Sequence, residues 1–120
     1  MDGVTPLRGE IWYADFGQPL GHEQGGPRPS LIVSHDRWNR GRSGLVIALP
    51  LTTKDKGFPH HVRVDPPEAG LGKPGFIKCE DVRSISTSRL QRRLGAVSKS
   101  TMLRVEETMR QLLGLWATGT

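Results

Sequence analysis

The residue with the clearest capacity for chemistry is Arg28, which stands between two prolines. Pro27 and Pro29 restrict the backbone on both sides, so we expect them to hold the arginine in place. A guanidinium presents its donors as a planar fork that suits phosphate oxygens, and it stays charged at any working pH. Arg28 therefore predicts a phosphate contact, and the alternative is an arginine that is merely solvated in a loop.

Three polar residues precede this arginine, namely His22, Glu23 and Gln24. Glu23 could orient Arg28 or take a proton as a general base, and the imidazole of His22 can exchange a proton near neutral pH. Exposed loop residues without any role would look the same in the sequence.

Thr52 stands directly after an apolar run, residues 45–51, that predicts a buried strand. At the end of such a strand its hydroxyl could bond a phosphate, with Thr53 as the substitute candidate. The alternative is a threonine that bonds the local backbone. Lys54 and Lys56 follow in a polar segment and could contact the backbone of a single-stranded nucleic acid.

Lys78 and Glu80 alternate with apolar residues in the run 76–85, which predicts a strand. Because side chains flip at every residue of a strand, the two should share a face, ~7 Å apart. A catalytic pair and an ordinary surface ion pair both fit that placement. Cys79 should point the other way and pack in the core.

Metal and nucleotide chemistry find little support in the sequence. There is no pair of CxxC motifs and no HExxH motif, so zinc is not indicated. His60 and His61 are adjacent, but neighbours on a strand face opposite ways and should not bind one ion. The glycine-rich residues 17–29 lack the Gly-Lys-Ser/Thr ending of a phosphate-binding P-loop. The sequence therefore predicts no metal and no cofactor.

The elements that must position these residues are mostly short strands. Segments of β-formers or continuous apolar residues indicate them. Residues 17–29, with four glycines and three prolines, indicate a long loop after the first strand. The predicted strands cover residues 8–16, 30–34, 45–51, 61–65 and 76–85.

The C-terminal part has a different periodicity. Residues 97–113 carry apolar residues at three- and four-residue spacing, which predicts an amphipathic helix. Ser98 or Ser100 can cap its start, and Gly114 can end it. We therefore expect a mainly β fold, a small, strongly bent barrel with a C-terminal α-helix packed on it.

The length and composition of the chain fit one domain. The chain has 120 residues with 35% hydrophobic and 24% charged residues, and we expect a single domain over residues 8–115 with tails at 1–7 and 116–120. A core of this size gains from pairing with a second copy. The net charge of +5 suits a nucleic acid or an acidic protein partner, although a basic soluble surface would give the same total.

The compartment can be inferred from what the sequence contains. Cys79 is the only cysteine, so no intrachain disulfide can form. The first residues lack the pattern of a signal peptide, and no apolar run approaches the ~20 residues of a membrane span. We expect a cytoplasmic protein.

Several short strings occur in a specific order and together span nearly all of residues 8–115. They are Gly-Glu-Ile-Trp at 9–12, Gly-His-Glu-Gln at 21–24, Gly-Pro-Arg-Pro at 26–29, Trp38 with Asn39, Val-Ile-Ala-Leu-Pro-Leu-Thr-Thr at 46–53, and Lys-Cys-Glu-Asp-Val-Arg-Ser-Ile at 78–85. Each string alone is weak, but the ordered set resembles the MazF/PemK (Kid-like) toxin endoribonucleases.

The resemblance implies a homodimer with an SH3-like or CcdB-like barrel, acting as the toxin of a type II toxin–antitoxin system. It implies metal-independent, sequence-specific cleavage of single-stranded RNA, in which a 2′-hydroxyl attacks the adjacent phosphate. The products would carry 2′,3′-cyclic phosphate and 5′-hydroxyl ends, and translation and growth would stop. The implied protein partner is a MazE/PemI-like antitoxin with an acidic, flexible C-terminal tail.

The resemblance also implies roles for single residues. Arg28 matches the family's loop arginine, a phosphorane stabiliser and possible acid, and Thr52 matches its threonine, with Glu23 or Glu80 as general base. Lys78 and Glu80 match an arginine and an aspartate that one branch uses as acid and base, but a lysine lacks the fork of an arginine. The implied substrate contacts are His22, Gln24, Thr53, Lys54, Lys56 and Lys78.

Two other functions stay open at this point. A gyrase poison of the same fold acts through a C-terminal Trp-Gly-Ile, whereas Trp116 is followed here by Ala117. A non-catalytic RNA-binding barrel is the second alternative, motivated by the lysine at position 78.

Overall fold

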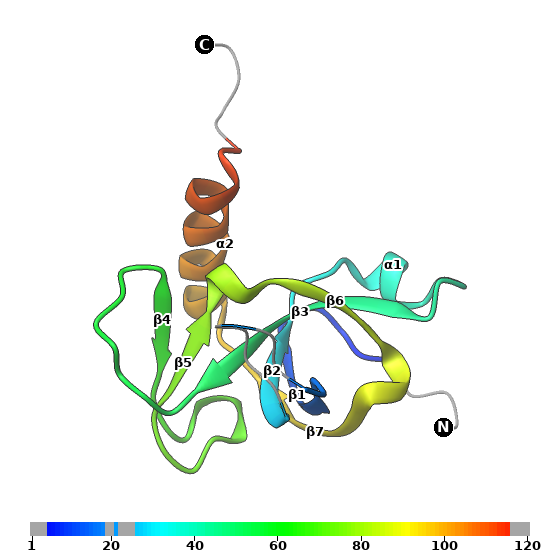
Figure 1. Ribbon diagram of the computed structural model, residues 1–120, viewed down its shortest axis with the longest axis horizontal. Coiled ribbons are helices and arrows are strands. Elements are labelled where there is room, and N and C mark those ends of the chain that lie inside the picture. Colours follow the sequence, from blue (N-terminus) through cyan, green and yellow to red (C-terminus); the bar gives the residue numbers. More distant parts are fainter. Residues whose placement is uncertain (1–4, 19–20, 22–25, 116–120) are drawn as a thin grey trace.

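The computed structural model describes residues 5–18, residue 21 and residues 26–115. Within these ranges the chain forms antiparallel strands, two α-helices and short 3₁₀ turns (Figure 1). The strands are β1 (Glu10–Asp15), β2 (Pro27–Ile32), β3 (Leu45–Thr52), β4 (His61–Val64), β5 (Gly75–Lys78), β6 (Arg83–Ser86) and β7 (Leu90–Ala96). The helices are α1 (Asp36–Asn39) and α2 (Lys99–Leu113), and the 3₁₀ turns are η1 (Glu68–Gly70), η2 (Cys79–Asp81) and η3 (Thr87–Arg89).

The long strand β3 organises the sheet. The strand order is β4-β5-β3-β2-β1-β7, and β6 also pairs with β3. The first half of β3 pairs with β6 and its last two residues pair with β5. Because its two halves have different partners, β3 spans a bend of the sheet, and α2 lies over the β4–β5 end (Figure 1). The predicted mainly β fold with a C-terminal helix is confirmed.

The apolar runs of the sequence became strands, but the predicted loop 17–29 is too long. The strand β2 already begins at Pro27. Its first residues pair with β1 alone, since pairing with β3 starts at Ser30. A proline lacks the N–H that a second neighbouring strand would need, so prolines fit this one-sided stretch. Arg28 is consequently a strand residue rather than a loop residue.

The predicted strand 76–85 is wrong as one element. The strand β5 ends at Lys78, η2 turns the chain at Cys79–Asp81, and β6 begins at Arg83. Both strands pair antiparallel with β3, but on different halves of it. The turn η2 lets the chain pass from one half of β3 to the other. It also ends the alternation of side chains on which the prediction for Lys78 and Glu80 depended.

The strand β7 was not predicted. Its residues Leu90–Ala96 are exposed or half-buried, so they lack the apolar run or alternation that marks a strand. The whole of β7 nevertheless pairs with β1, with register shifts along the way. Pairing with a distant segment, rather than local composition, makes this strand.

The core has two parts because the central strands bury both of their faces. Neighbouring residues of β1 fall in different clusters: Ile11 packs with Leu31 and Val105, whereas Trp12 packs with Ile32 and Val46. This follows from the period of two in a strand. One cluster lies beneath α2, and the other fills the opposite side of the bent sheet.

The C-terminal helix closely follows the prediction. Ser98 caps its start by accepting a hydrogen bond from the Thr101 N–H, and Gly114 ends it with a left-handed φ of 69°. The carboxylate of Glu68 in η1 accepts hydrogen bonds from the Ser98 N–H at 2.9 Å and from the Thr101 hydroxyl at 2.6 Å. The start of α2 is thereby fixed to the turn before β5. Neither helix among the described residues has the length and apolar content needed to cross a bilayer.

The predicted tails are only partly described. Residues 1–4 and 116–120 lie outside the described ranges. The backbone of Pro6 and Leu7, within the predicted N-terminal tail, bonds the side chains of Asn39 and Glu10. This described part of the tail is therefore held on the domain.

Candidate active site

A cavity of about 410 Å³ opens where β1, β2, β7 and the end of β3 meet the segment 70–75. Arg28 and Thr52, which the sequence singled out separately, both line it. The described residues of its lining are Tyr13, Arg28, Pro29, Leu51, Thr52, Thr53, Gly70, Leu71, Gly72, Lys73, Pro74, Gly75, Arg92 and Leu94.

The sheet register explains why Arg28 and Thr52 meet. Pairing of β2 with β3 runs from Ile32 opposite Ala48 to Ser30 opposite Pro50. The pairing ends there, because the last two residues of β3 pair with β5 and the first residues of β2 pair with β1 alone. Arg28 and Thr52 each lie two residues beyond this last pair, at the same end of the two strands. Both residues therefore border the same cavity.

The hydroxyl of Thr52 is held by the local backbone. Thr52 is 7% exposed, and its Oγ1 accepts a hydrogen bond from the Lys54 N–H at 3.2 Å. This is the local backbone bond that was the predicted alternative to a phosphate contact. The two roles are compatible, because a hydroxyl that accepts one bond still has a proton to donate.

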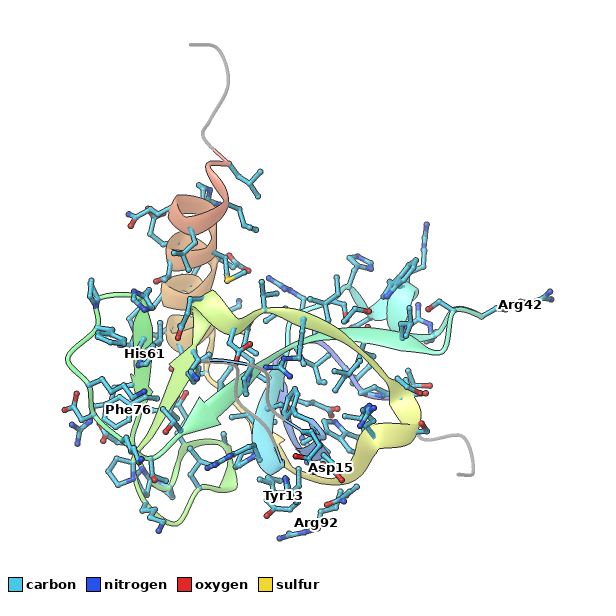
Figure 2. All side chains as sticks on the ribbon, viewed as in Figure 1. Tyr13, Asp15, Arg42, His61, Phe76 and Arg92 are labelled. Atoms are coloured by element: carbon cyan, nitrogen blue, oxygen red, sulfur yellow. The ribbon has the colours of Figure 1, made fainter. Side chains whose placement is uncertain are left out.

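Further functional candidates at the cavity were not predicted. Arg92 of β7 pairs in register with Tyr13 of β1, and its guanidinium lies 5.6 Å from the centroid of the Tyr13 ring (Figure 2). Lys73 adds a second cation to the rim. Predicting Arg92 as a site residue would have required predicting β7, and that strand was not predicted. With Arg28, these side chains give the cavity a positive lining.

The other predicted site residues have different outcomes. His22, Glu23 and Gln24 fall outside the described residues. Thr53 lines the cavity, whereas Lys54 and Lys56 are exposed and are not part of its described lining.

Lys78 and Glu80 do not form the shared-face pair that the sequence predicted. Lys78 is buried, with its Nζ 3.7 Å from a carboxylate oxygen of Asp81. Glu80 instead lies in η2 with its carboxylate 3.0 Å from Nε2 of His61 and 3.7 Å from Nε2 of His60. Neither Lys78 nor Glu80 belongs to the described lining of the cavity. The strand β5 ends at Lys78, so the alternation of side chains stops before Glu80.

Cys79 is buried, as the sequence predicted. Burial, together with the nearby charge of Glu80, raises the pKa of the Cys79 thiol to about 12. The thiol is thus protonated at neutral pH and is not an active nucleophile.

His60 and His61 do not point to opposite sides, and the prediction that they would is wrong. The strand β4 begins at His61, and His60 belongs to the turn before it. Strand alternation therefore does not apply to this pair, and the two rings lie 5.1 Å apart beside the same carboxylate.

Comparison with known proteins agrees with the fold and with the resemblance. Residues 7–113 match the family described as PemK-like, MazF-like toxin of type II toxin–antitoxin system. Endoribonuclease MazF9 of Mycobacterium tuberculosis is 34% identical over 115 residues, which cover 92% of this chain and 98% of the relative. Endoribonuclease EndoA of Bacillus subtilis is 30% identical over 109 residues, covering 90% and 94%.

Solved structures give the same result. The crystal structure of MazF from Deinococcus radiodurans superposes with a TM-score of 0.82 at 32% identity, covering 93% of this chain and 99% of that one. An endoribonuclease from a mycobacterial species, solved in complex with its cognate antitoxin, superposes with a TM-score of 0.76 at 31% identity, with the same coverage of 93% and 99%.

Proposed function

We propose that this chain is an endoribonuclease, because it belongs to the family of PemK-like, MazF-like toxins of type II toxin–antitoxin systems. The relatives from Mycobacterium tuberculosis and Bacillus subtilis carry that activity in their names. The observation that supports the proposal most directly is the cavity lined by Arg28 and Thr52. Its positive lining suits a phosphodiester backbone.

The proposed reaction is attack by an RNA 2′-hydroxyl on the adjacent phosphate. Arg28 would neutralise the charge that builds on the phosphorane, and it is the candidate to protonate the leaving oxygen. Thr52 would donate its hydroxyl proton to a phosphate oxygen, since the Lys54 N–H already occupies one acceptor position of Oγ1. A donor placed at developing charge typically contributes about 10²–10³-fold in rate. The cut strands would end in 2′,3′-cyclic phosphate and 5′-hydroxyl.

The general base is proposed to come from outside the described lining, which contains no Asp or Glu. Glu23 is the first candidate because it lies five positions before Arg28 in the chain. Glu80 is the second candidate, although its carboxylate contacts two imidazoles. The proposed RNA contacts are His22, Gln24, Thr53, Lys54, Lys56 and Lys78, to which the cavity adds Tyr13, Lys73 and Arg92.

The aromatic ring of Tyr13 suits a role in base recognition. It is half-buried beside Arg92, and its ring lies against the guanidinium. Unstacked RNA bases commonly stack on aromatic rings and on arginine planes in single-strand sites. We therefore include Tyr13 as a stacking platform for a base next to the cut.

The test is incubation of the protein with a long RNA in EDTA. We expect discrete fragments with 2′,3′-cyclic phosphate and 5′-hydroxyl ends, lost with Arg28→Ala. Arg42→Ala is the matched control, because Arg42 lies in an exposed loop far from Tyr13 and Arg92 (Figure 2). Intact RNA with retained binding would favour a binding-only barrel, and gyrase-dependent DNA breaks would favour a gyrase poison.

The partners follow from the same proposal. We expect a homodimer, and an antitoxin whose acidic, flexible C-terminal tail competes with RNA for the positive cavity. MazE–MazF complexes from Deinococcus radiodurans support an antitoxin partner. The proposed compartment is the cytoplasm, which suits a lone cysteine and an RNA substrate.

A further inference from the structure

A cluster of two histidines and one glutamate lies outside the described lining of the cavity that contains Arg28 and Thr52. Nε2 of His61 is 3.0 Å from one carboxylate oxygen of Glu80, and Nε2 of His60 is 3.7 Å from the other. Ligand atoms of the three residues all lie within 4.8 Å of one another. We propose that His60, His61 and Glu80 bind a divalent transition-metal ion, Zn²⁺ by preference. None of the three belongs to the described lining of the cavity, and only Glu80, the second candidate for general base, also appears in the proposed ribonuclease reaction.

The donor types and spacing fit this ion. Imidazole nitrogens and carboxylate oxygens are ordinary zinc ligands at about 2.0–2.1 Å, so donors of a tetrahedral site stand about 3.3 Å apart. The two distances to the Glu80 carboxylate lie on either side of that value. The side chain of His60 is 29% exposed, and its contact with the carboxylate is the longer of the two.

The fold brings the ligands together from two segments. His61 pairs with Lys78 between β4 and β5, and the turn η2 then carries Glu80 back over the start of β4. The ring of Phe58 stacks on His60 at 5.0 Å and meets the edge of His61 at 5.2 Å. Sheet pairing and aromatic packing thus hold the donors near each other without a metal, which lowers the ordering cost of binding one.

Charge also favours a cation. The recorded partners of Glu80 among the described residues are the two imidazoles, so neutral histidines leave its negative charge without a cationic neighbour. Nδ1 of His61 is buried with no hydrogen-bond partner in the described part of the chain. Nε2 of the same ring donates to the Glu80 carboxylate at 3.0 Å, and a metal ion bound through this nitrogen would replace that proton.

The site resembles an open zinc centre more than a closed structural one. Three protein ligands leave a fourth position for water or an external ligand. Glu80 is 34% exposed at its side chain, which gives an ion a path from solvent. A bound ion would link the turn before β4 to η2, and His61 marks this place beside α2 in Figure 2.

The experiment measures binding to tag-free, metal-stripped full-length protein without RNA. Titration with Zn²⁺ against a chromophoric chelator should give one ion per chain, and Zn²⁺ should raise the Tm. Glu80→Gln and His60→Asn keep size and polarity at exposed or half-exposed positions, and each should weaken binding at least about tenfold. Co²⁺ should give the visible absorption of a low-coordinate site in the wild type and lose it in both variants.

The matched controls are His35→Asn and Asp65→Asn. His35 caps α1 by accepting from the Arg37 N–H, a role that asparagine can keep, and Asp65 pairs with Arg63 on the surface. Both controls should bind Zn²⁺ like the wild type. Binding of clearly less than one Zn²⁺ per chain would overturn the site. Zn²⁺ affinities of Glu80→Gln and His60→Asn equal to that of the wild type, with unchanged circular dichroism, would also overturn it. Because RNA is absent, failure here leaves the ribonuclease proposal untouched, and the reverse also holds.

Discussion

The hydroxyl of Thr52 joins the backbone to the proposed chemistry at the scale of a single residue. It is 7% exposed, accepts from the Lys54 N–H and lines the same cavity as Arg28. A hydroxyl oriented in this way can donate in only a narrow range of directions. The proposed role of Thr52 therefore depends on a bond that also ends the strand.

Replacing Thr52 with valine tests this double role. Thr52→Val removes the hydroxyl at nearly constant volume, so cleavage of a short fluorescent RNA in a single turnover should slow by about 10²-fold. The unpaired Lys54 N–H should also cost about 1 kcal/mol in urea unfolding. Thr52→Ser, which keeps the hydroxyl, should lie near the wild type in both measurements. Equal rates for the serine and valine variants would refute the phosphate contact.

Residue chemistry predicted Arg28 and Thr52 as site candidates, because one stands between two prolines and the other directly follows an apolar run. It could not identify Arg92 or Tyr13. Their proximity depends on the register between β1 and β7, which no local pattern encodes. The same limit explains the separation of Lys78 from Glu80, since a turn inside an alternating run is invisible to periodicity.

At the scale of elements, the contact between η1 and β7 leaves no room for side chains. A Cβ built on Gly95 would lie 2.6 Å from the backbone carbon of Ala69, and one on Gly70 would lie 2.2 Å from the carbonyl oxygen of Leu94. The segment that borders the cavity and the strand that carries Arg92 are thus packed backbone to backbone.

Gly95→Ala should therefore push β7 away from η1. We expect a loss of roughly 1–3 kcal/mol in unfolding free energy, the usual cost of overpacking. Chemical denaturation followed by circular dichroism measures it. Gly72→Ala is the control, because a Cβ there meets nothing within 4 Å. If Gly95→Ala were as stable as the control, the close contact between β7 and η1 would not contribute to stability.

The Glu68 carboxylate at the start of α2 should make the stability of the fold depend on pH. Burial raises the pKa of the Glu68 carboxyl, but the hydrogen bonds from Ser98 and Thr101 outweigh it and the net pKa is lowered. A carboxyl whose pKa is lowered in the folded state stabilises the fold at pH values above its pKa in the unfolded chain, about 4.3. This contribution disappears as the pH falls through the pKa of the folded state.

Glu68→Gln should accordingly reduce the Tm at pH 7, and the gap to the wild type should narrow as the pH drops below about 4.3. Thermal melts across this range provide the measurement. Glu107→Gln, on an exposed part of α2 with Arg110 as its partner, should show a small and flat difference. A Glu68→Gln gap that stays constant with pH would contradict the assigned role of the carboxylate.

The fold was predictable to the extent that its elements are apolar. Continuous apolar runs gave β2 and β3, and three- and four-residue spacing gave α2 with its serine cap and glycine end. The strand β7 was not predicted, because its position at the edge of the sheet leaves its arginines in solvent and removes the apolar pattern. Elements created by pairing with distant segments need three-dimensional information that composition does not contain.

At the scale of the whole molecule, the positive cavity and an apolar groove are separate surfaces. The groove, about 380 Å³, runs along α2 and includes Ile47, Val82 and Leu113, large apolar side chains that stay at least partly exposed. None of its described lining residues belongs to the cavity of Arg28 and Thr52. Such a separation would let a second copy bind at the groove without covering the RNA site, in line with the proposed homodimer.

The net charge of +5 predicts RNA binding that weakens with salt, and the structure predicts which charges matter. Each phosphate contact on a single strand contributes about 0.7 to the slope of log affinity against log salt. Lys73→Ala and Arg92→Ala, at the rim of the cavity, should each lower the slope by about that amount in fluorescence anisotropy with an uncleavable RNA. Arg42→Ala removes the same charge from an exposed loop and should leave the slope unchanged. Equal effects of all three variants would mean that RNA follows the overall charge of the protein rather than the cavity, and the proposed position of the scissile phosphate would then lose its support.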